Sequence, residues 1–158
     1  MIEKTIKVQI GERTMNRWSS RSAARLDTCH PDLKTLANEV LKVHDCSVME
    51  GHRDKETQNL YYENGTSRVR YPDGKHNKNP SRAIDLAPYK KGADPYDMEN
   101  VLYFAGIVMA TAARLYAAGL MTHKLRWGGT WSSRADYPFV FDNPHRNFFD
   151  GIHFELED

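Results

Sequence analysis

The sequence has few of the features that would set it apart from ordinary globular proteins. Its 158 residues include two cysteines, too few for a disulfide framework or a cysteine-rich zinc module, and we expect both to be buried, reduced thiols. The 22 Lys and Arg residues nearly balance the 21 Asp and Glu residues, which gives a formal net charge of +1. This balance removes any global electrostatic case for binding nucleic acid or an anionic membrane.

Long hydrophobic runs are also missing. Residues 1–25 alternate charged and apolar residues without a run of signal-peptide length, so we expect synthesis in the cytoplasm without an export signal. The longest uncharged apolar stretch, 101–113, is shorter than the roughly 20 residues that span a bilayer, which predicts a core helix and no membrane insertion. No repeat, low-complexity segment or linker interrupts the chain. We therefore expect a single domain over 1–158, with 1–30 as its N-terminal lead-in segment.

Hydrophobic periodicity predicts the helices. Apolar residues recur at helical spacing over 31–43, and again in a long central helix that we expect to begin at Asp94 and end near residue 119. Asp54 is placed to cap a further helix that reaches about residue 62.

Short apolar runs predict strands at 46–49, 83–87, 125–127 and 152–156. The region 63–80 between the first two is rich in Gly, Pro and polar residues, which predicts a loop with at most a short strand around Val69. Within 83–87 the apolar residues alternate around Asp85, so this carboxylate lies on the face opposite the core. Together the elements predict an α+β fold with a short antiparallel sheet packed against helices.

Two of the seven histidines stand out as candidates for chemistry. His76 lies in the polar loop before the Asp85 strand, and His153 lies on the last strand after a turn at Asp150 and Gly151. A His/Asp/His set that leaves a fourth position to water is typical of catalytic zinc. For the other five we find no carboxylate or histidine partner at a defensible spacing and expect solvation or local hydrogen bonds: His30, His44, His52, His123 and His145.

Two carboxylates accompany this candidate metal set. Glu155 is two residues from His153 on the same face of the predicted strand, where it can hold the second ring nitrogen. Asp150 lies three residues before His153, from where it can take a proton from the attacking water and return it to a leaving amine. Spacing alone favours the alternative that Asp150 only forms the turn.

Most of the chain carries a family resemblance. It resembles the zinc peptidases of the L-alanyl-D-glutamate endopeptidase and D-alanyl-D-alanine carboxypeptidase group, especially tailed-phage endolysins, in the strings GKHNKNPSRAIDLAPY, RWGGTW and FFDGIHFEL. It also resembles their N-terminal helical segment in RSAARLDTCHPDL and their strand, arginine turn and helix in VMEGHRDKETQ. The resemblance implies that His76, Asp85 and His153 bind zinc. It further implies that Asp150 is the catalytic base and that Arg53 stabilises the polarised carbonyl oxygen or binds a substrate carboxylate.

The same resemblance implies the function. We expect a Zn²⁺-dependent peptidoglycan hydrolase that cleaves the L-alanyl-D-glutamate amide of the stem peptide, as a phage endolysin in host lysis. The alternatives are a D-alanyl-D-alanine carboxypeptidase and a non-catalytic zinc- or wall-binding module. We expect a monomer without a separate wall-binding domain, made in the host cytoplasm and released to the wall by a holin. The segment 137–147 is extra length. We expect its Phe139 and Phe141, with Phe148 and Phe149 just after it, in the core, with a cleft wall as the alternative.

Overall fold

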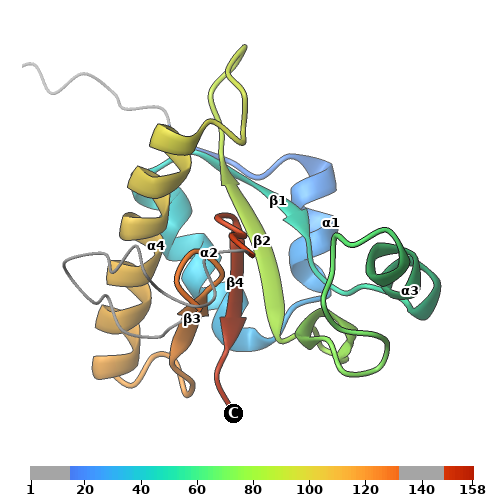
Figure 1. Ribbon diagram of the computed structural model, residues 1–158. Helices are drawn as coiled ribbons and strands as arrows, with labels where there is room; N and C mark the ends of the chain where they lie inside the picture. Colours follow the sequence, from blue (N-terminus) through green and yellow to red (C-terminus); the bar gives the residue numbers. More distant parts are fainter. Residues whose placement is uncertain (1–14, 132–147) are drawn as a thin grey trace, which may run out of the picture.

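A four-stranded antiparallel sheet lies at the centre of the computed structural model of the protein, which describes residues 15–131 and 148–158 (Figure 1). Along the sheet the strand order is β1-β2-β4-β3. The strands are β1 (Cys46–Glu50), β2 (Ala83–Pro88), β3 (Leu125–Trp127) and β4 (His153–Leu156). The last strand therefore inserts between β2 and β3, and its register sets Asp85 of β2 opposite His153 of β4.

Two long helices cover one face of the sheet. α2 and α4 pack against each other and against β2, α4 also contacts β3, and α1 packs against β1 (Figure 1). α3 follows β1 at the edge of the molecule, and the short 3₁₀ helix η1 precedes β2 (Figure 1). The helices are α1 (Ser20–Asp27), α2 (Pro31–Val43), α3 (Lys55–Glu63), η1 (Lys75–Asn77) and α4 (Met98–Ala117).

The predicted strands and helices agree with the structure to within one residue, apart from the central helix, which begins four residues later than predicted and ends at Ala117, before the predicted end near residue 119. That helix, α4, begins at Met98 after Asp97, whose carboxylate accepts a hydrogen bond from the Asn100 amide at 3.0 Å. Asp94 instead closes a turn by accepting from the Tyr96 amide at 2.8 Å. The predicted start at Asp94 is wrong because two aspartates offer a cap and the later one takes it.

The long loop 63–80 contains η1 and no strand at Val69. The Val69 carbonyl instead accepts a hydrogen bond from Gln58 Nε2 of α3 at 2.7 Å, which ties the loop to that helix. The predictions for 137–147, including Phe139 and Phe141, for His145 and for the first half of the lead-in segment lie outside the described residues. The core prediction for the next two residues is wrong, because Phe149 is 43% exposed and Phe148 is half-buried and lines a hollow beside His76.

The core lies between the sheet and the two long helices. Ile84 and Leu86 of β2 and Phe154 of β4 are fully buried, and alternation along the strands leaves Asp85 and His153 on the other face. α2 contributes side chains at helical spacing: Leu33, Leu36, Ala37, Val40 and Leu41. The two thiols, Cys29 and Cys46, are free and buried as expected, and burial raises their pKa values to about 11 and about 12.

α4 has the length and apolar composition of a possible membrane span, at 20 residues. In the structure one side of this helix is buried in the core through Val101, Phe104, Ala105, Val108, Ala112 and Leu115. Its packing against α2, β2 and β3 accounts for the apolar residues on that side.

Replacing Leu36 tests this core. Leu36 of α2 is fully buried, so Leu36→Ala removes apolar contacts and opens a cavity, and we expect it to lower the free energy of unfolding by about 2–5 kcal/mol in urea denaturation. The matched control is Leu60→Ala on α3, whose side chain is 57% exposed and should cost less than about 0.5 kcal/mol. Equal losses for the two variants would contradict the placement of the core.

Candidate active site

Three side chains from separate segments converge on the sheet face opposite the core. β2 supplies Asp85, β4 supplies His153, and η1 supplies His76. His76 Nε2 lies 3.2 Å from Asp85 Oδ1 and 3.2 Å from His153 Nδ1, and His153 Nδ1 lies 3.2 Å from the same Asp85 oxygen. Zinc bonds of about 2.0–2.1 Å in a tetrahedron place ligand atoms roughly 3.3 Å apart, so this triangle has the size of one face of a zinc site.

The hydrogen bonds behind the two rings decide which nitrogens are available. His76 Nδ1 donates to the Gly51 carbonyl at 2.7 Å, which leaves a lone pair on Nε2. His153 Nε2 faces Glu155 Oε2 at 3.0 Å, which leaves a lone pair on Nδ1. Three acceptor atoms thus point at one another with no shared hydrogen in the neutral rings, an arrangement that fits a metal cation among them.

Electrostatics at this point also favour a cation. Burial by itself raises the pKa of Asp85, but the His76 and His153 rings lower it well below its usual range. Burial lowers the pKa of His153, but Asp85 and Glu155 outweigh burial and raise it to about 10. The carboxylates therefore need positive charge between them, which a divalent cation supplies in place of ring protons.

Glu155 stands behind His153, as its spacing suggests. Its carboxylate contacts His153 Nε2, and its other oxygen lies 3.4 Å from Arg126 Nη1 of β3. Burial raises the pKa of Glu155, yet the contact with His153 and the charge of Arg126 lower it below the ordinary value. An ionised Glu155 fixes the tautomer of His153 that presents Nδ1 to a metal.

Asp150 lies on the turn that leads into β4. Its amide donates to the Gly128 carbonyl at 3.0 Å, and its carbonyl accepts from the His153 amide at 3.2 Å. A side chain at Gly128 would lie 2.5 Å from the Asp150 carbonyl oxygen, so glycine permits this close approach. Burial, followed by the charge of Asp85, raises the pKa of Asp150, a shift that suits a group that accepts and returns a proton.

Arg53 follows β1 and reaches toward Asp85. Its Nη1 donates to Gln58 Oε1 at 3.1 Å, its Nη2 pairs with Glu50, and Nη2 lies 3.9 Å from Asp85 Oδ2. Among the described residues its buried Nε has no hydrogen-bond partner. Burial lowers the pKa of Arg53 but Glu50 more than compensates, so the guanidinium stays charged beside the metal set with one donor to spare.

The converging side chains open onto two hollows. One, of ≈350 Å³, is lined by His76, His153 and Glu155 among others, and the other, of ≈800 Å³, includes Asp85. Arg53, Thr66 and Asp150 line both hollows. The candidate active site therefore lies in an extended cleft that can hold a chain-like substrate.

Comparison with known proteins agrees with this chemistry. A family model described as phage L-alanyl-D-glutamate peptidase matches residues 15–157. The chain belongs to this family. The crystal structure of the Serratia marcescens L-Ala D-Glu endopeptidase ChiX has the same fold, with a TM-score of 0.67 and 23% identity over 91% of this chain and 92% of that one. A search of curated proteins finds no match.

The family assignment confirms the expected peptidase acting on peptidoglycan, and the architecture confirms the expected α+β fold. The structure brings all the predicted site residues to one place, although their individual roles remain proposals: His76, Asp85, His153, Asp150, Arg53 and Glu155.

Sequence reasoning missed the residues that hold Arg53 in this peptidase. Gln58 is 1% exposed and accepts hydrogen bonds from both Arg53 Nη1 and Asn77 Nδ2. Asn77 Nδ2 also lies 3.1 Å from the Arg53 carbonyl, and Glu50 pairs with the guanidinium. The sequence does show Gln58 shortly after Arg53 and Asn77 directly after His76, but only the structure shows that both are buried.

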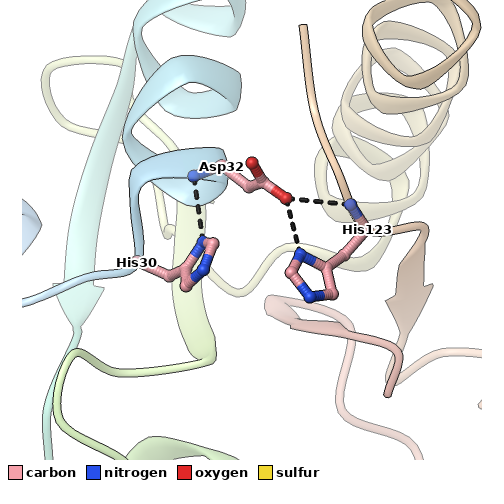
Figure 2. Close-up of side chains that lie close together, drawn as sticks. All are labelled: His30, Asp32 and His123. Atoms are coloured by element: carbon pink, nitrogen blue, oxygen red, sulfur yellow. Dashed lines mark hydrogen bonds and ion pairs between the residues drawn. The ribbon is translucent and has the colours of Figure 1, made fainter. Parts of the chain in front are cut away.

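One prediction about the remaining histidines is wrong. His123 has a carboxylate partner, because its Nδ1 lies 2.9 Å from Asp32 Oδ2, and its ring meets that of His30 (Figure 2). The two contacts join α2 to the segment between α4 and β3, so sequence spacing could not reveal them.

Glu155→Gln tests the support behind His153. The substitution keeps the shape of the side chain but weakens its hold on the ring, so we expect zinc affinity to fall about 10–100-fold in a competition titration with a chromophoric chelator. Glu157→Gln, two residues further along, is the matched control and should leave the affinity unchanged. Unchanged affinity in Glu155→Gln would remove its assigned role.

Proposed function

We propose that this peptidase is a zinc-dependent endolysin that hydrolyses the L-alanyl-D-glutamate amide of the peptidoglycan stem peptide. The observation that carries the zinc assignment is the 3.2 Å triangle of His76 Nε2, Asp85 Oδ1 and His153 Nδ1. A zinc ion held there would polarise the scissile carbonyl and lower the pKa of the attacking water.

The chain's own groups supply the rest of the proposed chemistry. Asp150, with its raised pKa, takes a proton from the attacking water and delivers it to the nitrogen of the leaving amine. Arg53 lines both hollows, and its charged guanidinium stabilises developing negative charge or binds a substrate carboxylate. Glu155 keeps His153 in its binding tautomer throughout.

The shape of the cleft favours an endopeptidase over a carboxypeptidase. Because Arg53, Thr66 and Asp150 line both hollows, a bound peptide can extend away from the metal set in two directions. An endopeptidase must hold peptide on both sides of the scissile amide, whereas a carboxypeptidase has only the terminal D-alanine on one side. A non-catalytic binding module has no use for a buried carboxyl with a raised pKa beside the metal set.

The family also supports a proposal about the biological setting. We propose that the protein is made in the host cytoplasm, acts as a monomer, and reaches the wall after a holin opens the membrane. The family is one of phage peptidases, which supports this route.

Digestion of purified peptidoglycan by the zinc-loaded protein tests the reaction. We expect mass spectrometry of the released fragments to show new D-glutamate amino termini. Free D-alanine would assign the carboxypeptidase instead. Intact walls of several chemotypes, with zinc confirmed in the protein, would assign the binding module.

Asp150→Asn tests the proton-transfer role separately. We expect kcat to fall about 10²–10⁴-fold while the zinc content stays at the wild-type level, because the amide cannot accept the proton and Asp150 is not a ligand. Asp27→Asn, on an exposed side chain of α1, is the matched control and should keep full activity. Retained hydrolysis by Asp150→Asn would exclude it as the base.

A further inference from the structure

We propose that His30, Asp32 and His123 form a second binding site for a divalent transition-metal ion of the zinc type. His30 caps α2, Asp32 lies in its first turn, and His123 lies between α4 and β3 (Figure 2). One ligand atom from each residue lies within 4.8 Å of the others, and the donor set of two imidazoles and one carboxylate matches that of the candidate active site. Such a nitrogen and oxygen set favours zinc over calcium or magnesium.

The site is distinct from the catalytic one. The His30 amide donates to the Ser81 carbonyl, just before β2, and Leu125 after His123 pairs with Leu156 at the end of β4. His153, by contrast, begins β4. The two clusters therefore lie at opposite ends of the same strand.

Backbone and hydroxyl donors are enough to hold the Asp32 carboxylate in place. They do not explain why the rings of His30 and His123 face each other beside it. Asp32 Oδ2 accepts from the Thr122 amide and hydroxyl, each at 3.0 Å, and from the His123 amide at 2.9 Å. These three contacts hold α2 to the segment before β3 without any imidazole. The rings add a contact of their own, edge to face with centroids 5.1 Å apart (Figure 2).

The electrostatic setting suits metal binding. The pKa of His30 is lowered, chiefly by burial. The charge of Asp32 opposes this shift and that of His123 adds to it. The lowered pKa favours the neutral ring, which is the form that binds metals. Hydrogen bonds from His123 and Thr122 keep the pKa of Asp32 low against the effect of burial, so the carboxylate is ionised. Both histidines are half-buried, which leaves a route for an ion and room for a water ligand.

Binding requires a small local adjustment. The ligand atoms must close from within 4.8 Å to roughly 3.3 Å of one another, which rotation of the half-buried rings can provide. A metal on His123 Nδ1 replaces the proton that this nitrogen shares with Asp32 Oδ2, and that proton leaves to solvent. The Asp32 amide donates a hydrogen bond to His30 Nδ1, and this bond is lost if Nδ1 binds the ion.

Metal stoichiometry tests the site in the intact chain. Protein stripped with a chelator, reloaded with Zn²⁺ and dialysed against metal-free buffer should retain two ions per chain by elemental analysis. His153→Ala, which disables the candidate active site, should retain one, and His153→Ala combined with His30→Asn should retain none. One ion in wild type with none in His153→Ala would overturn the proposal, as would loss of the second ion on dialysis.

Matched variants separate loss of a ligand from loss of structure. His30→Asn keeps a side-chain acceptor suited to a helix N-cap while it removes the imidazole, so it should fold, keep peptidase activity and bind one ion. His44→Asn changes a histidine outside both clusters and should leave two ions. In the His153→Ala background Zn²⁺ should raise Tm by several degrees, and His30→Asn should abolish that rise. A rise that survives His30→Asn would place the ion elsewhere.

Discussion

The antiparallel pairing of β2 with β4 is the constraint on which the rest of the site depends. Its register sets Asp85 opposite His153, so a carboxylate oxygen and a ring nitrogen meet at 3.2 Å on the face that the core leaves free. The same alternation buries Ile84 and Phe154 between the sheet and the long helices. A slip of one residue would exchange these faces, so the hydrophobic core holds the geometry of the candidate metal site in place.

The groups around Asp85 and His153 are paired by hydrogen bonds and by opposite charges. Glu155 and the Gly51 carbonyl fix the far nitrogens of the two rings, so that the near nitrogens present lone pairs. Arg53 balances Asp85, and Glu50 in turn balances Arg53. Buried charges of this kind are costly when unpaired, and their mutual pairing leaves one place, among three acceptor atoms, where positive charge is still required.

The two His/Asp/His clusters contain the same residue types but differ in geometry and hydrogen bonding. In the candidate active site the three ligand atoms already lie 3.2 Å from one another, which is metal spacing. Around Asp32 the ring of His123 donates to the carboxylate, and the cluster also works as a clamp between α2 and the segment before β3. An ion there would strengthen a tertiary contact, whereas an ion at Asp85 would take part in the reaction.

The sequence by itself determined the helices, the strands and the residue types of the metal set, because periodicity, caps and short motifs are local properties. It also placed Glu155 behind His153, two residues away on one strand. Only the tertiary structure decided that η1 brings His76 to His153 across 77 residues, and that Asp32 meets His123 across 91. It alone revealed Gln58 as the support of Arg53. Such contacts depend on how distant segments pack, which local pattern does not encode.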